Sequence, residues 1–241
     1  MDIKVLFEDN HFIAVNKPNR LLVHSDVTGD KTLSDWVKNY IKEKYKKPGE
    51  VFLGVIHRLD RPVSGVTLFA RTTKGLQRMN KLFHDREIEK VYWAITYTRP
   101  PKLSDTLENF LWKDTLKNKT KVLPGKSRRH PDAKKAILSY ELISELNHHC
   151  LLEIKPITGR SHQIRAQLAA MDCPIIGDLK YGYPTCPIKG AIDLHSRSLS
   201  FIHPIKKEPV KIVAEPPANR IWDWFENVNQ KAKKVRKKKR R

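Results

Sequence analysis

The sequence predicts an α+β fold, with a mixed, largely antiparallel sheet in two lobes flanked by helices. Short apolar runs rich in β-branched residues recur along the chain. Turn-forming residues bound each run, as in strands that are at least half buried. Only three longer segments carry apolar residues at helical spacing. Because hairpin patterns outnumber any alternation of strand and helix, a sheet made of parallel βαβ units does not fit.

The individual elements follow from the spacing of apolar residues. Strands are predicted, in order, at residues 5–7, 12–15, 51–56, 66–70, 90–98, 136–144, 150–154, 199–202 and 210–213. Helices are predicted at residues 32–45, 74–86 and 161–171, and a short one starts at Ile221. Thr32 and Asp35 resemble a capping box at the start of the first helix, and Pro174 follows the end of the third. Residues 113–129 are polar, basic and turn-prone, so they are predicted to form an irregular excursion.

The chain is expected to form one domain followed by a basic tail. Residues 1–227 hold every predicted element, and their number suits one large domain or two closely joined lobes. Residues 231–241 contain nine lysines and arginines, including Lys233 and Lys237, and no acidic residue. Such a segment cannot bury apolar surface. Residues 228–241 are therefore predicted to be disordered when free and to act as a nonspecific phosphate anchor.

The net charge points to a polyanionic partner. The chain has 47 lysines and arginines against 26 aspartates and glutamates, which gives a formal net charge of +21. Residues 113–135 alone carry nine basic side chains, so the excess is not confined to the tail. Nucleic acid is the partner that this charge favours.

Several other classes of protein are disfavoured. Three cysteines with no CxxC pair argue against a disulfide framework or a zinc site, and they favour a reducing, cytoplasmic location. No apolar run reaches the length of a membrane-spanning helix, so no membrane partner is expected. Neither GxGxxG nor GxxxxGKS/T occurs, which gives no support for a nucleotide cofactor.

Asp60 is the strongest candidate for a reactive group. It lies within residues 57–61, His-Arg-Leu-Asp-Arg, on a predicted loop between two apolar runs. The two neighbouring guanidinium groups favour the ionised carboxylate, which suits a nucleophile, a base or an anionic clamp. An ion pair that merely braces a turn fits these five residues equally well.

Two further residues are candidates to act with Asp60. Arg165 lies in an otherwise apolar helix, so part of it should be buried beside a carboxylate, unless it extends to the surface. Asp60 is the obvious partner. Tyr92 shares a strand face with Ala94, where its ring could stack on a base or simply belong to the core. Residues 158–165 open the helix with two arginines and free backbone amides, which together favour an anion site.

Taken together and in order, these blocks resemble the RluA-type RNA pseudouridine synthases. The matching segments are residues 15–18 through His24, 57–60 with 64–65, 90–94, 158–165, 174–178 with 181–182, and 194–195 through 203–204. The resemblance implies a pseudouridine-synthase-like catalytic fold whose two lobes flank a basic cleft. It also implies isomerisation of specific uridines in structured RNA, rRNA or tRNA, by base flipping and without a metal or organic cofactor.

Carried over to this sequence, the resemblance assigns three catalytic residues. Asp60 would be the catalytic carboxylate, Tyr92 would stack on the target base, and Arg165 would pair with Asp60. Asp60 could attack the ribose C1′ or the uracil C6, or remove a sugar proton, and the sequence leaves these routes open. The residues predicted to bind RNA are Lys17, His57, Arg58, Arg61, Arg160, His162, Gln163, Lys233 and Lys237. Among them, Arg58 would fill the gap left by the extruded nucleotide.

Two other functions remain as alternatives. One is a non-catalytic RNA-binding or ribosome-assembly protein that uses the same cleft, and the other is a basic DNA-associated protein. The chain is expected to be a monomer. It is also expected to lack a separate N-terminal RNA-binding domain, because the first strand begins near residue 3.

Overall fold

A computed structural model describes residues 3–25, 29–219 and 221–225. The strands are β1 (Val5–Glu8), β2 (Phe12–Lys17), β3 (Gly54–Val55), β4 (Ser64–Ala70), β5 (Glu89–Thr96), β6 (Ser104–Asp114), β7 (Lys119–Leu123), β8 (Lys134–Leu146), β9 (His149–Pro156), β10 (Leu194–Ile202) and β11 (Pro209–Val213). The helices are α1 (Leu33–Lys44), α2 (Thr73–Asp85), α3 (Gln163–Ala170) and the 3-10 turn η1 (Leu179–Tyr181), and residues 221–225 are also helical.

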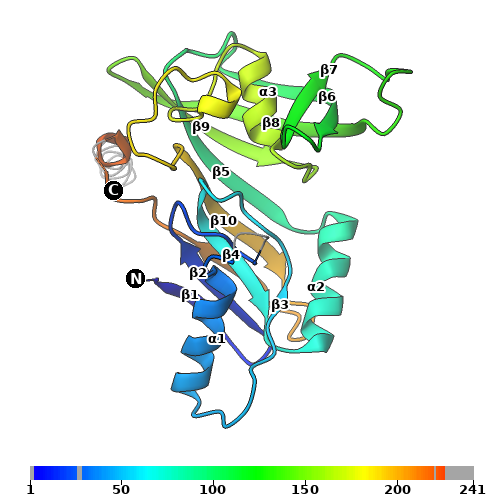
Figure 1. Ribbon diagram of the computed structural model, residues 1–241, viewed down its shortest axis with the longest axis vertical. Coiled ribbons are helices and arrows are strands. Elements are labelled where there is room, and N and C mark those ends of the chain that lie inside the picture. The colour runs from blue at the N-terminus through cyan, green and yellow to red at the C-terminus, as the bar shows by residue number, and fades with distance from the viewer. Residues whose placement is uncertain (1–2, 26–28, 220, 226–241) are drawn as a thin grey trace, which may run out of the picture.

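All of these strands belong to one mixed sheet. Its order is β1-β2-β4-β10-β5-β9-β8-β6-β7, with β3 beside β4 and β11 beside β10. Within the described part of the chain, only the β4–β10 pair is parallel. Figure 1 shows two halves, one carrying α1 and α2 on β1–β4 and the other carrying α3 beside β6–β9, with β5 and β10 running between them. The predicted α+β class is therefore confirmed.

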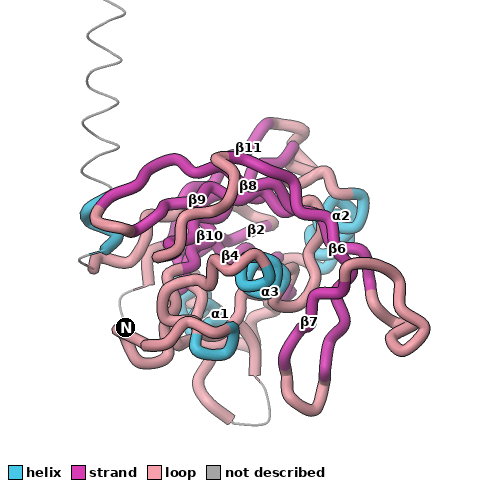
Figure 2. The backbone as a smooth tube through the Cα atoms, turned by 90° about the horizontal axis from the view of Figure 1, so that it is seen from above, coloured by secondary structure: helices cyan, strands magenta, loops and turns pink. Residues whose placement is uncertain are grey.

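Residues 113–129 are more regular than the sequence suggests. β6 runs into a turn at Asp114, and β7 returns antiparallel to it, with Lys119 opposite Asp114 and Leu123 opposite Phe110. Figure 2 shows this hairpin projecting from the rest of the molecule. The prediction of an irregular excursion is wrong for residues 113–114 and 119–123. Lysines alternate in residues 119–123, so the segment lacks the regular spacing of apolar residues that would predict a strand. The strand forms because β6 offers its backbone a hydrogen-bonding partner.

The strand β6 was not predicted, and β3 and β10 also differ from the predicted strands. β3 covers only two residues of the predicted strand 51–56, and the chain leaves the sheet soon after it. β10 begins at Leu194, five residues before the predicted strand 199–202. Its early residues pair with both β4 and β5, and that long-range pairing leaves no local signal.

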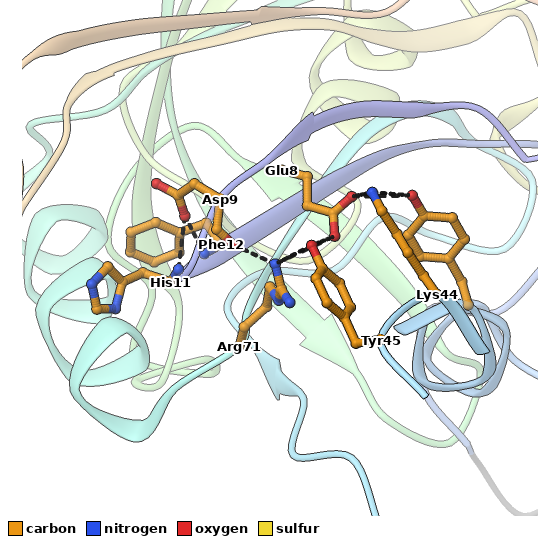
Figure 3. Close-up of polar contacts among 8 residues, drawn as sticks. Glu8, Asp9, His11, Phe12, Lys44, Tyr45 and Arg71 are labelled. Carbon is orange, nitrogen blue, oxygen red and sulfur yellow. Dashed lines mark hydrogen bonds and ion pairs between the residues drawn. The ribbon is translucent and has the colours of Figure 1, made fainter. Parts of the chain in front are cut away.

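Glu8 ties the first hairpin to the end of α1. Its carboxylate accepts hydrogen bonds from Lys44 at 2.6 Å, Tyr45 at 2.8 Å, Tyr40 at 3.1 Å and Arg71 at 3.3 Å (Figure 3). Burial would raise the pKa of Glu8, but the hydrogen bonds from Lys44, Tyr45 and Tyr40 lower it below its usual value. The ionised carboxylate therefore anchors the helix to the sheet.

Gly65 permits the close approach of β4 and β10. Its φ is +115°, and a Cβ there would lie 2.3–2.8 Å from backbone atoms of Ser196. No other residue fits this position without moving a strand. Gly65 thus sets the spacing of the two strands next to the loop that carries Asp60.

Among the helices of the described residues, none has the length and apolar character that crossing a membrane requires.

Gly65→Ala should destabilise the fold by about 3 kcal/mol or more, because it adds both a strained φ and a clash with backbone atoms. Urea denaturation measures the difference. Gly49→Ala is the matched control, since a Cβ at Gly49 meets nothing within 4 Å. Equal stabilities of the two variants would contradict the close-approach explanation.

Candidate active site

Asp60 lies on the loop between β3 and β4, where a tight turn holds it. The amide of Val63 donates to the carbonyl of Asp60 at 3.0 Å. Leu59 and Val63, on either side, are buried in the core, whereas the carboxylate of Asp60 remains about one-third exposed, at 32 %. The loop therefore presents one carboxylate to solvent from a backbone fixed by packing.

Arg165 bridges Asp60 and a second, fully buried carboxylate. Its Nη1 donates to Oδ2 of Asp60 at 2.8 Å, while Nε and Nη2 donate to the two oxygens of Asp178 at 2.7 and 2.9 Å. Burial would lower the pKa of Arg165, but the bonds to Asp178 and the charge of Asp60 raise it above its usual value. The guanidinium is therefore charged and fixed in orientation.

The two arginines next to Asp60 in sequence are not its partners. Nη2 of Arg61 pairs with Asp30 at 2.8 Å, and its Nε donates to the carbonyl of Arg20. Arg58 is exposed. The compensating charge comes from Arg165 instead, which corrects the expectation based on neighbouring residues.

Tyr92 on β5 lines the same cavity as Asp60. The cavity has a volume of about 140 Å³, and its walls include Asp60, Tyr92, His162 and Arg165. Burial raises the pKa of Tyr92 to about 12, and the charge of Asp60 acts in the same direction. The phenol is therefore protonated at neutral pH.

A larger cavity of about 790 Å³, here called the trough, shares this wall. Its basic lining residues are Arg58, Arg61, Lys90, Lys113, Arg160, Arg165 and Lys180. Asp60 is the single acidic residue among those that line it. The trough is therefore a cationic surface with one carboxylate in its floor, suited to a polyanion.

Two of the predicted RNA-binding residues are buried and hold the loops instead. Lys17 is fully buried, and its Nζ donates to the carbonyls of Pro18 at 2.9 Å and Arg61 at 3.2 Å. Gln163 is 4 % exposed, and its amide bonds to Thr158, to the amide of Arg160 and to the carbonyl of residue 137. Gln163 also lines the 140 Å³ cavity, and direct RNA contact by Lys17 and Gln163 stays a prediction.

The other predicted RNA-binding residues divide into two groups. The trough is lined by Arg58, Arg61, Arg160 and His162, and also by His57. Nε2 of His57 accepts from the amide of Leu68 at 3.0 Å, and burial lowers the pKa of His57 to about 4, so this ring is neutral. Lys233 and Lys237, with the whole predicted tail, lie outside the described residues.

Three further residues, Asp178, Tyr181 and Thr120, belong to the site and were not predicted from the sequence. Tyr181 accepts from the amide of Thr120 at 2.8 Å and lies 2.8 Å from Nδ1 of His162. Asp178 and Tyr181 lie in residues 174–178 and 181–182, which carry part of the resemblance to the RluA-type family. That resemblance was the one sign in the sequence that these two residues belong to the site. Across the residues that the structure describes, no three histidine, cysteine or carboxylate side chains are grouped to hold a metal ion.

Solved structures define the class of fold. The human RNA Pseudouridylate Synthase Domain Containing 4 superposes with a TM-score of 0.76 and 27 % identity, covering 90 % of this chain and 89 % of that chain. The human RNA Pseudouridylate Synthase Domain Containing 1 shares the fold, with a TM-score of 0.69 and 20 % identity, covering 90 % and 84 % of the two chains.

The family model described as RNA pseudouridylate synthase matches residues 11–170, so the chain belongs to that family. This confirms the RluA-type resemblance. The chain is 31 % identical to the ribosomal large subunit pseudouridine synthase C of Buchnera aphidicola, over 87 % of this chain and 66 % of that protein. It is 28 % identical to the tRNA pseudouridine synthase C of Vibrio parahaemolyticus, over 89 % and 90 %. The chain spans about two thirds of the length of the ribosomal relative.

Asp178→Asn should lower the free energy of unfolding by about 3 kcal/mol or more, because it removes a buried partner of Arg165. Urea denaturation measures the change. Asp105→Asn is the control: its carboxylate is 36 % exposed and pairs with Lys102, so the loss should be below about 1 kcal/mol. Similar small losses in both variants would show that the Asp178 pair contributes little.

Burial of Lys17 should make stability depend on pH. Burial lowers the pKa of Lys17 from 10.5 to about 7, although the charge of Asp60 opposes this. Between these values the unfolded chain binds more protons than the folded one. The free energy of unfolding should therefore rise with pH there, by at most about 1.4 kcal/mol per pH unit.

Lys17→Met should remove this slope, which denaturation curves from about pH 7.5 to 9.5 would detect. Lys42→Met, at an exposed position on α1, is the control and should keep the slope of the unaltered protein. If Lys17→Met also kept it, Lys17 would not be neutral in the folded protein.

Proposed function

We propose that this protein isomerises specific uridines in structured RNA to pseudouridine, with Asp60 as the catalytic carboxylate. The observation that carries the proposal is the placement of Asp60 as the one acidic group lining a cationic trough, bonded to Arg165 and beside Tyr92. Membership of the RNA pseudouridylate synthase family supports the same reaction. The non-catalytic and DNA-associated alternatives leave this constellation unexplained.

The three catalytic residues come from three separate elements and divide the work. A stacked uridine must first be flipped out of the RNA, at a cost of a few kcal/mol. The ring of Tyr92 offers the flipped base a stacking surface in the 140 Å³ cavity. Arg165 fixes Asp60, which then attacks C1′ or C6 or removes a sugar proton. The released uracil rotates and rejoins the ribose through C5, so the cavity has to retain it.

Phosphate contacts along the trough can offset the cost of base flipping. Arg58, Arg61 and Arg160 lie there with exposed side chains. Arg58 would fill the gap left by the extruded nucleotide. His57 and His162 also line the trough. Lys233 and Lys237 of the tail would add nonspecific contacts and steepen the salt dependence.

The RNA substrate is proposed to be rRNA or tRNA. The similar proteins from Buchnera aphidicola and Vibrio parahaemolyticus are named for large-subunit rRNA and for tRNA respectively. The domain limits 1–227 and 228–241, a monomeric state, catalysis without a cofactor and a cytoplasmic location stay predictions.

Asp60→Asn should abolish turnover while leaving RNA affinity within about twofold of the unaltered protein, because the amide preserves shape but neither ionises nor attacks. Turnover is measured as tritium release from RNA labelled at uridine C5, and affinity by filter binding of the same RNA. Asp105→Asn, on a surface ion pair, should retain both properties.

Tritium release by Asp60→Asn would contradict the role of Asp60. If the unaltered protein bound structured RNA yet released no tritium, the non-catalytic alternative would replace the proposed function.

A further inference from the structure

Tyr181 contacts both side chains that approach the carboxylate of Asp60. Its ring lies 5.0 Å from Cζ of Arg165, and its hydroxyl lies 2.8 Å from Nδ1 of His162. Nε2 of the same imidazole lies 3.7 Å from Oδ2 of Asp60. The four side chains form one cluster, and three of them, Asp60, His162 and Arg165, line both the cavity and the trough.

The hydrogen bonds around Tyr181 indicate which nitrogen of His162 carries the proton. The backbone amide of Thr120 donates to the hydroxyl oxygen of Tyr181 at 2.8 Å. An amide N–H can only donate, so the hydroxyl hydrogen of Tyr181 is left to be donated. If Nδ1 of His162, 2.8 Å away, is its acceptor, a neutral ring carries its proton on Nε2, facing Asp60.

The imidazole of His162 is held in the neutral form by its surroundings. Burial lowers its pKa below 6.5. The charge of Asp60 opposes this shift, whereas the charges of Arg165, Lys180 and Lys113 reinforce it. A neutral ring can accept from Tyr181 on one side and offer an N–H on the other.

The backbone directs the imidazole toward the site rather than toward the helix. His162 is the N-cap of α3, yet its side chain makes no capping hydrogen bond. Its φ of +52° is left-handed, which a residue other than glycine adopts only when its surroundings hold it there. Thr120 on β7 secures the preceding residue, because its hydroxyl donates to the carbonyl of Ser161 at 2.9 Å.

We propose that His162 is a positioning residue for the catalytic carboxylate, held in the Nε2–H form by Tyr181; this role rests on the proposed function. The Nε2–H group of His162 and Nη1 of Arg165 both approach the same oxygen, Oδ2 of Asp60. The 3.7 Å separation exceeds a direct hydrogen bond, and a movement of about 0.5 Å would close it. Within the described chain no side chain bonds to Oδ1, so Oδ1 is the oxygen presented for reaction.

The tautomer is tested by NMR on the full-length protein labelled with ¹⁵N-histidine. We expect the His162 ring, assigned by comparison with His162→Gln, to show the Nε2–H pattern at about pH 7.5, where it is neutral. Tyr181→Phe removes the donor to Nδ1, so a mixture of tautomers is expected. An Nδ1–H ring in the unaltered protein, or a pattern that Tyr181→Phe leaves unchanged, overturns the proposal.

The positioning role is tested by single-turnover kinetics. The probe is total RNA from cells lacking this protein, labelled with tritium at uridine C5. His162→Ala should slow tritium release by up to about 100-fold, because Asp60 Oδ2 loses one of its restraints. The Kd for the same RNA should change by less than about twofold. His162→Gln keeps a side-chain N–H and should recover part of the rate.

His84→Ala is the matched control, because that imidazole is 88 % exposed on α2, and its rate should equal that of the unaltered protein. An unaltered rate for His162→Ala, or a loss of rate that parallels a loss of RNA affinity or of folding, overturns the positioning role. Absence of tritium release by the unaltered protein instead sinks the proposed function, while the NMR result still decides the tautomer.

Discussion

The arrangement of this site depends on one guanidinium group shared between two carboxylates. Arg165 is 5 % exposed, so its buried charge is tolerated because every nitrogen of the fork has a carboxylate partner. Asp178, at 1 % exposed, takes two of its N–H groups and fixes the plane of the fork. The remaining nitrogen is then presented to Asp60 in one direction. The buried Arg165–Asp178 pair thus orients the partly exposed Arg165–Asp60 pair, and the catalytic proposal relies on that orientation.

The fold brings these groups together from distant segments. Asp60 comes from the loop before β4, Tyr92 from β5 and Arg165 from α3, and the order β4-β10-β5 in the sheet places the first two elements on either side of β10. Gly65 lets β4 approach β10 closely enough for this. Lys17 then secures the turn from behind by bonding to the carbonyl of Arg61. The site is therefore supported by packing and by backbone hydrogen bonds rather than by its neighbours in sequence.

Electrostatics distinguishes this trough from an ordinary basic surface. Seven cationic side chains line it, and a single carboxylate lies among them. The surrounding positive potential attracts phosphate groups. The buried Tyr92, with its pKa raised to about 12, adds a neutral ring next to that charge.

Local patterns in the sequence predicted the α+β class, most strands and helices, and the loop position of Asp60, because the spacing of apolar residues acts over short stretches of chain. The cost of burying a charge likewise predicted that a buried Arg165 needs a carboxylate partner. The strand β7, the burial of Lys17 and Gln163, and the parts taken by Asp178 and Tyr181 were decided only by tertiary structure. Each of these features depends on which distant segment packs or pairs against the residue concerned. A short stretch of sequence contains no information on such long-range contacts.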